Sequence, residues 1–439
     1  MVTKPTQTES IRPRRQISGA LESSSMNTLS HYFEGKERIE PFPFTGMLLR
    51  KGTPAALSVS DRQRILHAAR TGDVVNLGKY LEIVHFTHVG IVTYFLEWSL
   101  QFPTTLAGDH YGKQGAELER RCTSETFEQW SRAVESIAKD PDTREAVSLL
   151  SSLFAPDSLK PGTAKLFRKQ TKPRFKGIRT VAAPLLREVA ERQEASLKLI
   201  REGAVQEFET HFANYWNFIA AVHDGITQYD QSYPAVVNRL VSQEVAEELL
   251  HRSFSQCSFF EMLWMFLHVM TPHELAGFYA DHLRGHFSGG GREGSVEIIE
   301  EEDRYRLIPD ACGSGGAMRR RLAQAGSPAE VFANASSSTW GLKNQVPPYC
   351  SHCAMNEKES IRRFGFPVQV TEFDPDPNKP CGWTMYKDPN KIPEHVFTRL
   401  GHKKDPSKFR QVNLKYKILR FFGIRLGIQQ KVVLPDLSR

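Results

Sequence analysis

The sequence contains little cysteine, with six residues among 439, at positions 122, 257, 312, 350, 353 and 381. So few thiols in a chain of this length exclude a small disulfide-stabilised scaffold. The first 25 residues lack the apolar core of a signal peptide. The most apolar run, residues 259–270, contains Glu261 and His268 and is too short to span a bilayer. These absences predict a soluble, cytoplasmic protein with free thiols.

Acidic residues are scarce in two segments. The net charge is +7, yet residues 391–439 hold twelve Lys or Arg against three Asp or Glu, and residues 155–184 hold eight against one. Such segments could meet nucleic acid or an acidic partner. Neither contains a recognisable nucleic-acid-binding motif. We therefore interpret them as a solvated tail and a linker, and expect neither nucleic acid nor a membrane among the partners.

The length of the chain exceeds what one ordinary hydrophobic core holds, which predicts several units. Shifts in proline, glycine and charge divide the sequence into a flexible N-terminal segment (1–56), a helical unit (57–154), a basic linker (155–184), a second helical unit (185–287), a cysteine-bearing α+β domain (288–390) and a basic tail (391–439). The predicted fold class is α+β, with the N-terminal two thirds mainly helical. Ser60 is placed to cap the first helix, and an apolar face at residues 186, 189, 197 and 200 indicates a helix after the linker.

The two helical units share a pattern that suggests an internal duplication. Residues 62–74 read RQRILHAARTGDV and residues 192–205 read RQEASLKLIREGAV, so that Arg-Gln is followed in both by Arg-x-Gly-x-Val. The alternative is two unrelated amphipathic bundles, which need the same spacing of apolar residues.

The cysteine-bearing region is predicted to contain two hairpins and a helix. Residues 295–310 suggest two short strands around an acidic turn, and residues 365–389 suggest a second hairpin with a loop rich in Asp, Pro and Asn. Between them, residues 351–365 suggest a helix that ends at Gly365.

Four of the six cysteines fall within this region. Cys350 and Cys353 form a C-x-x-C at the start of the predicted helix, where residues i and i+3 project the same way. Cys312 follows the first hairpin, and Cys381 begins a strand of the second. Four thiolates in a tetrahedral array are a preferred zinc site. We therefore predict zinc bound by these four cysteines.

Two other interpretations of the cysteines remain open. Cys312 precedes Gly-Ser-Gly-Gly, whose backbone N–H groups could form an anion-binding nest and lower the pKa of a nucleophilic thiol. His352 would then act as the base, and Asp310 would orient it. Alternatively, the cysteines are buried and without a chemical role.

Four segments of the C-terminal third carry a resemblance to known proteins: RYRLIPDACGSGG, PPYCSHC, RFGFPVQVTEFDPDP and PCGWTMYKDP. Over roughly residues 280–390 they resemble L-2-amino-thiazoline-4-carboxylic acid hydrolase-like proteins and small ligand-binding domains of the four-vinyl-reductase type. The resemblance implies a site for a small sulfur- or nitrogen-containing molecule, and hydrolase activity. The sequence departs from the hydrolase family by carrying C-x-x-C in place of adjacent cysteines.

His223 and Asp224 are the further candidates for catalysis. They lie in the apolar, aromatic stretch YWNFIAAVHDGITQYD, where polar side chains must be paired or bind a ligand. We expect Asp224-Gly225 to end or bend a helix and both side chains to face a pocket lined by Tyr215, Trp216, Phe218 and Tyr229. The sequence thus predicts a zinc- or thiol-dependent enzyme acting on a small polar molecule. The alternative is a small-molecule-binding protein with a structural zinc.

Overall fold

The computed structural model describes residues 37–41, 48–106, 112–156, 158, 181–255, 270–309 and 311–410. The predictions for residues 1–36, for most of the basic linker, for residues 259–269, for Asp310 and for the chain after 410 fall outside the described residues. The described part is mostly helical and carries two small sheets, which confirms the α+β class. Among its helices, none combines the length and the apolar character that crossing a membrane requires.

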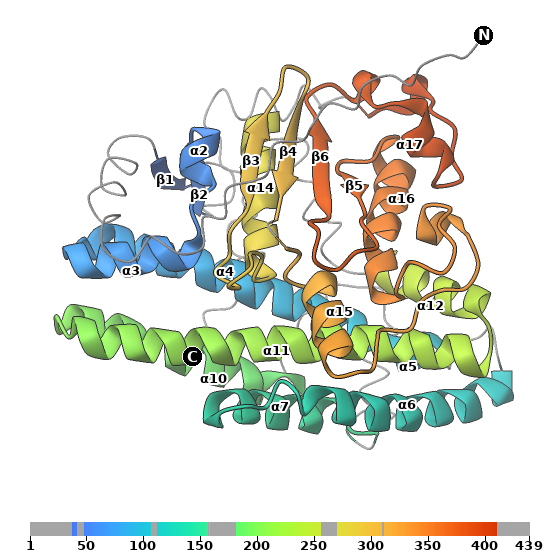
Figure 1. Cartoon of the computed structure of the whole chain (residues 1–439), viewed down its shortest axis with the longest axis horizontal. Helices are drawn as coiled ribbons and strands as arrows, with labels where there is room; N and C mark the ends of the chain where they lie inside the picture. The colour runs from blue at the N-terminus through green and yellow to red at the C-terminus, as the bar shows by residue number, and fades with distance from the viewer. Residues whose placement is uncertain are drawn as a thin grey trace, which may run out of the picture.

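The helical part is built around one long central helix. Helix α11 (Val205–Leu240) is 36 residues long and packs against α4, α6, α7, α10 and α12, as Figure 1 shows. The other helices of this part are α3 (Asp61–Thr71), α4 (Val74–Ser99), α5 (Gln101–Leu106), α6 (Gly112–Val134), α7 (Pro141–Phe154), α10 (Ala183–Arg201) and α12 (Gln243–Ser255).

The two stretches that share a sequence pattern also share a local structure. The Ser60 side chain accepts a hydrogen bond from the backbone of Gln63 and caps α3, as predicted. Helix α3 then ends at Gly72 and α10 is followed by Gly203, and both glycines have φ near +70°. A long helix begins two residues after each glycine. A left-handed glycine is the usual way to end one helix and turn into the next, so the equivalence of the two stretches includes the turn.

The predicted hairpins and helix of the C-terminal third are confirmed. Strands β3 (Glu297–Glu300) and β4 (Arg304–Ile308) pair antiparallel, as do β5 (Val370–Glu372) and β6 (Gly382–Tyr386). Strand β4 also pairs with β6, which gives a four-stranded sheet of order β3-β4-β6-β5. Helix α16 (His352–Phe364) ends at Gly365, with φ 87°.

The remaining elements flank this sheet and the bundle: β1 (Glu37–Pro41), β2 (Leu48–Gly52), α2 (Pro54–Leu57), α14 (Pro272–Gly285), α15 (Gly315–Gln324) and α17 (Glu394–Thr398), with short 3-10 turns at Ser337–Thr339, Tyr349–Ser351, Pro389–Lys391 and Pro406–Lys408. Strands β1 and β2 form the second sheet, an antiparallel hairpin. Buried apolar side chains from the bundle and from the four-stranded sheet belong to one continuous cluster.

The segment predicted to be a basic tail is folded in its first twenty residues. Ile392, Val396, Phe397 and Leu400 are buried in the common core. The backbone N–H of Arg410 donates to the carbonyl oxygen of Phe364 at the end of α16. The prediction of a solvated tail from residue 391 is therefore wrong for residues 391–410. The basic composition of this segment suggested a solvated chain, but the segment also contains a few well-spaced apolar residues. Burial of these residues is enough to anchor the segment to the core.

The prediction that the helix ends or bends at Asp224-Gly225 is wrong, because α11 continues to Leu240. Gly225 serves a different purpose there. A Cβ atom at this position would lie 2.4 Å from Leu150 Cδ1 on α7. In addition, the indole N–H of Trp130 on α6 donates to the Gly225 carbonyl oxygen at 2.7 Å. The glycine thus allows two helices to approach α11 closely.

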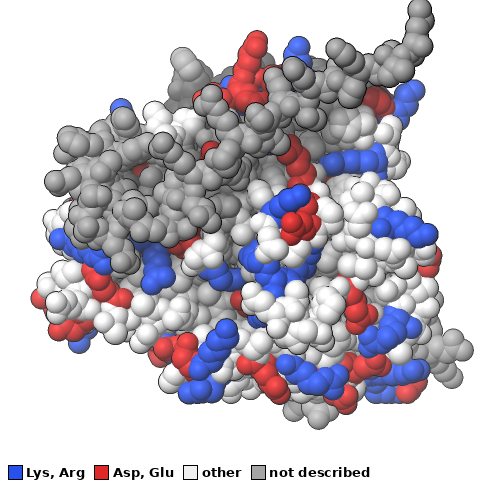
Figure 2. Space-filling model, in the orientation of Figure 1, with Lys and Arg blue, Asp and Glu red and all other residues white. Residues whose placement is uncertain are grey.

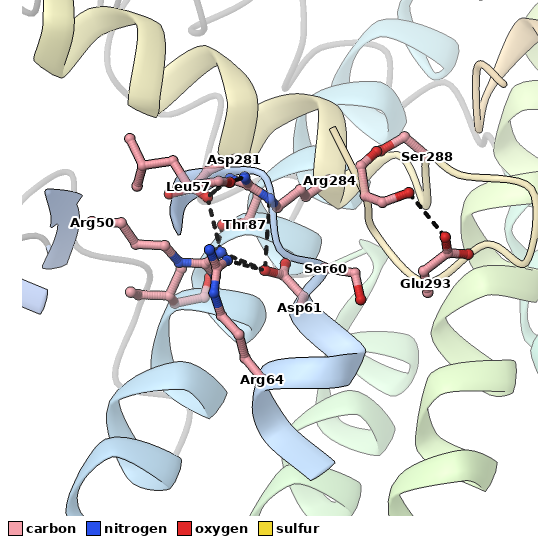
Figure 3. A network of polar contacts seen from close by, with 12 residues as sticks. Arg50, Leu57, Ser60, Asp61, Arg64, Thr87, Asp281, Arg284, Ser288 and Glu293 are labelled. Carbon is pink, nitrogen blue, oxygen red and sulfur yellow. Dashed lines mark hydrogen bonds and ion pairs between the residues drawn. The ribbon is translucent and has the colours of Figure 1, made fainter. Parts of the chain in front are cut away.

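A buried group of ion pairs joins the β1–β2 hairpin, α3 and α14 (Figure 3). Arg50 pairs with Asp61, Arg64 pairs with Glu37, and Arg284 pairs with Asp281. Arg284 also donates to the carbonyl oxygen of Leu57. Burial alone would raise the pKa of Asp61, but the three arginines lower it below its ordinary value. The carboxylates therefore stay ionised and offset the buried guanidinium charges.

We expect Asp61→Ala to destabilise the fold strongly. The substitution would leave the buried Arg50 and Arg284 to share the carboxylate of Asp281, and removing one partner of a buried ion pair typically costs about 3–5 kcal/mol. Chemical denaturation of both proteins measures the difference in the free energy of unfolding. Glu117→Ala is the matched control, because the Glu117–Arg120 pair is exposed and should contribute less than about 1 kcal/mol. Equal free energies of unfolding for the two variants would contradict the proposed contribution of the buried ion pairs to stability.

Candidate functional site

The four clustered cysteines line one cavity. Cys312, Cys350, Cys353 and Cys381 surround a hollow of about 40 Å³. One buried water needs roughly 10–15 Å³ on this measure, so the hollow has room for about three. We call it the cysteine cavity, and its other lining residues are Leu283, His286, Ser288, Pro309, Gly313, Ser314, Gly315, Gly316, Arg319, Tyr349, His352, Thr371, Phe373 and Trp383. The structure thus brings together the four residues that the sequence singled out.

Each cysteine reaches the cavity from a different local structure. Cys312 lies in the loop between β4 and α15, and Cys381 directly precedes β6. Cys350 lies in the 3-10 turn before α16, and Cys353 is in the first turn of that helix. The central pairing of β4 with β6 brings the ends of the two hairpins together. The sheet therefore brings close together cysteines that are far apart in the sequence.

The glycines after Cys312 let the loop pack against the other cysteines. A Cβ atom at Gly315 would lie 2.5 Å from Cys350 Sγ, and one at Gly316 would lie 2.9 Å from Cys312 Cβ. A Cβ atom at Gly313 would lie 2.0 Å from the carbonyl oxygen of His286. Real Cβ atoms do not approach other atoms this closely. The glycines are therefore required by close backbone approach to the cavity wall.

Three consecutive arginines on α15 brace the loops around the cavity. Arg319 donates to the Asp374 carbonyl oxygen at 3.2 Å. Arg320 donates to the carbonyl oxygens of Pro377 and Cys312 at 2.6 and 3.2 Å. Figure 2 shows Lys and Arg atoms gathered near the middle of the face where Figure 1 places α15. These guanidinium groups hold the segments of Cys312 and Cys381 in fixed positions and make the surroundings positive.

The third arginine, Arg321, ties α15 to the central helix through Asp224. Its Nη1 lies 3.0 Å from Asp224 Oδ2, and Arg292 Nη2 lies 2.7 Å from Asp224 Oδ1. Arg292 also donates to the carbonyl oxygen of Gly313. Burial alone would raise the pKa of Asp224, but the two guanidinium groups lower it well below its usual value. Asp224 is therefore an anion that connects the bundle to the loop of Cys312.

His223 belongs to a chain of hydrogen-bonded imidazoles that reaches the cavity. His223 Nδ1 lies 3.1 Å from Asp224 Oδ1, and His223 Nε2 lies 2.9 Å from His286 Nδ1. His286 Nε2 lies 3.4 Å from His282 Nε2. Burial lowers the pKa of both His223 and His286, so both rings are neutral near pH 7. His223 is therefore one hydrogen bond from the cavity lining, although it does not line the cavity itself.

The carboxylate fixes the tautomer of each ring in this chain. Asp224 can only accept, so His223 Nδ1 carries the hydrogen and His223 Nε2 is the acceptor. His286 Nδ1 must then donate to His223, which makes His286 Nε2 an acceptor, with His282 Nε2 as its donor at 3.4 Å. An imidazole oriented by a second imidazole and a carboxylate is a suitable proton acceptor.

His352 has a single hydrogen-bonded orientation. Its Nδ1 donates to the carbonyl oxygen of Tyr349 at 2.6 Å, and its Nε2 lies 3.5 Å from Cys353 Sγ. Burial lowers its pKa to about 4, so the ring is neutral and Nε2 is an acceptor. His352 therefore lines the cavity beside the C-x-x-C.

Three of the four thiols of the cavity are poorly suited to act as free nucleophiles. Burial raises the pKa of Cys350 and Cys353, and it raises that of Cys381 to about 12. Within the described residues, no group of three or more His, Cys, Asp or Glu side chains is arranged to hold a single metal ion. The four cysteines thus line the cavity without forming a group that could hold one metal ion. One zinc at the four cysteines stays a prediction that this arrangement does not fit.

Sequence reasoning missed several residues of the site. His282 and His286 lie one turn apart just before the glycine-rich segment, a pattern that could have been noticed. The arginines of α15 gave no signal beyond their charge. The predicted aromatic lining is wrong, because Tyr215, Trp216, Phe218 and Tyr229 are buried in the bundle and do not line the cysteine cavity. Asp310 and Cys257 lie outside the described residues.

Comparison with known proteins gives no match to any family model, curated protein or solved structure. The resemblance to hydrolase-like and four-vinyl-reductase-type proteins therefore stays a prediction.

We expect the buried imidazoles to make the fold sensitive to mild acid. His88 on α4 is fully buried between Trp216 and Phe287, with Asp61, His85 and His223 as its charged or titratable neighbours. Burial lowers its pKa to about 3. Below the pKa of an unfolded histidine, about 6.5, the unfolded chain binds a proton that the folded chain does not. This contribution to stability is therefore present at pH 7 and is lost as the pH falls from about 6.5 toward 3.

His88→Phe should make the free energy of unfolding depend less on pH. Each such proton changes it by about 1.4 kcal/mol per pH unit within that window. Denaturant titrations at several pH values between 7 and 4.5 measure the slope. His395→Gln, at an exposed position of α17, is the control and should keep the wild-type slope. A slope that His88→Phe leaves unchanged would contradict the assignment.

Proposed function

We propose that the protein is an enzyme that acts on a small polar, sulfur- or nitrogen-containing molecule beside the cysteine cavity. The observation that carries the proposal is that four cysteines from three segments line one cavity with His286, and that His286 is hydrogen-bonded through His223 to Asp224. Hydrolysis is the reaction class that suits these groups best, because it needs a base for water and an acid for the leaving group.

The imidazole chain supports proton transfer in both directions. His286 would take a proton from an attacking water and return it to the sulfur or nitrogen that leaves. The resulting positive charge on His286 would be stabilised through His223 by the Asp224 carboxylate, as in other oriented histidine pairs. His352 offers a second neutral acceptor on the cavity wall. The catalytic assignment of His223, Asp224 and His352 made from sequence is thus retained, with His223 acting through His286.

A polar cleft beside the cavity supplies a place for a small molecule. It has a volume of about 450 Å³ and is lined by Arg306, Ile308, Trp340, Leu342, Glu372, Phe373, Asp374, Pro380, Gly382 and Arg399. Phe373 lines both the cleft and the cysteine cavity. A volume of this size is typical of small-ligand sites. Its charged groups, with Arg306 beside Glu372 and Arg399 beside Glu357, would suit a small polar molecule.

A small-molecule-binding or regulatory protein is the second candidate. The cysteine cavity is small and has an apolar wall of Leu283, Pro309, Phe373 and Trp383. Such an enclosure favours a closed, structural centre over a reaction chamber. In that case the polar cleft would bind its ligand without turnover.

Turnover of 2-amino-thiazoline-4-carboxylic acid, the substrate class that the resemblance implies, tests the proposal. We expect the wild type to consume the compound, and His286→Asn and His223→Ala to lose about 10²- to 10⁴-fold in rate. Both variants should keep the far-ultraviolet circular dichroism of the wild type. His395→Gln should react at the wild-type rate. Loss of substrate is measured by chromatography.

The same variants distinguish the two candidates. Binding of the compound without turnover, measured by calorimetry, would support the binding protein and overturn the enzyme. Turnover that His286→Asn and His223→Ala leave unchanged would contradict the assigned roles of these residues. Neither binding nor turnover with a panel of related thiazolines and cyclic amides would remove this substrate class.

A further inference from the structure

We propose that the cysteine cavity holds an iron–sulfur cluster, bound by Cys312, Cys350, Cys353 and Cys381. The proposal uses the same cavity as the proposed function but goes beyond it, because it names the group at its centre. It is tested without a substrate. It therefore stands or falls separately from the reaction.

The first argument is the spacing of the four sulfurs. A zinc ion bound by four thiolates needs all four sulfurs about 2.3 Å from one point. Within the described residues, these side chains form no group of three or more that could hold one metal ion. An iron–sulfur cluster instead binds its cysteines through different iron atoms, so that the sulfurs surround it. Four cysteines placed around a hollow are the arrangement that a cluster requires.

The second argument is that the four thiols form one group despite this spacing. All four cysteines line the cysteine cavity. A Cβ atom at Gly315 would lie 2.5 Å from Cys350 Sγ, and one at Gly316 would lie 2.9 Å from Cys312 Cβ, so one turn of the loop packs against both cysteines. Cys350 and Cys353 lie three residues apart at the start of α16, where residues i and i+3 project the same way. The packing of the loop and the helix thus places the thiols as one group.

The third argument is the chemical surroundings of the hollow. A cluster ligated by four thiolates carries net negative charge, and Arg319 lines the cavity while being 8% exposed. Arg320 reaches the backbone of Cys312. The Gly-Ser-Gly-Gly loop brings backbone against Cys350 Sγ, and backbone N–H groups near the sulfurs tune such clusters. Thr371, Phe373 and Trp383 complete a wall that limits access of water.

The fifth cysteine that the structure describes offers a matched control. Cys122 lies on α6, is fully buried in the helical bundle and does not line the cavity. Its removal should therefore leave any bound cluster in place. A loss caused by general damage to the fold would affect this variant as well as the cavity variants.

The experiment is purification of the wild-type chain without oxygen from cells supplied with iron and cysteine. We expect iron and acid-labile sulfide in equal amounts, about two or about four of each per chain. A broad visible absorption should bleach with dithionite. Native mass spectrometry of the wild type gives the mass of the bound group, so this result needs no variant. Cys122→Ala should keep the full iron content, and Cys350→Ser and Cys381→Ser should each lose most of it.

The possible results separate the proposals clearly. About one zinc per chain, without iron or sulfide, would overturn the cluster and restore the single-ion prediction. Absence of any metal in the anaerobic wild type would overturn both. Equal iron content in Cys122→Ala and Cys381→Ser would remove the assigned ligands. If His286→Asn keeps the cluster and the wild type shows no turnover, the proposed function fails and the cluster proposal stands. If the wild type shows turnover but contains no cluster, the cluster proposal fails and the proposed function stands.

Discussion

The carboxylate of Asp224 is the contact on which the relation between the helical bundle and the cysteine cavity depends. It lies on the central helix, and it binds Arg292 from the glycine-rich segment and Arg321 from α15. A mostly buried carboxylate is tolerable because two guanidinium groups offset the loss of hydration. Because Arg292 also holds the carbonyl oxygen of Gly313, the position of the Cys312 loop follows from the position of α11.

The same anion sets the chemistry of the imidazoles around it. It fixes the hydrogen of His223 on Nδ1, and His223 in turn fixes that of His286. Burial keeps both rings neutral. Burial also keeps the thiols of Cys350 and Cys353 protonated. These two rings and these two thiols are therefore uncharged, and a positively charged centre would be needed to ionise the thiols.

Local structure was largely predictable from the sequence. The prediction failed where contacts between distant residues determine the structure. Ser60 and Gly365 mark helix ends as expected, since capping and a left-handed glycine act within a few residues. The Asp224-Gly225 pair was misinterpreted, because glycine usually breaks a helix. Here Gly225 stays within the helix, and its lack of a side chain lets α7 pack closely against α11. The basic composition of residues 391–410 likewise concealed apolar residues whose burial depends on α16 and the sheet.

The sequence by itself determined the α+β class, the two hairpins with a helix between them, and the four cysteines as one group. These features follow from periodicity, capping and spacing, which a single chain displays directly. Only the tertiary structure decided that His286 and three arginines of α15 join the site, and that His223 acts one step away from it. These contacts join residues far apart in the sequence, and their free energy comes from shared burial, which no local pattern encodes.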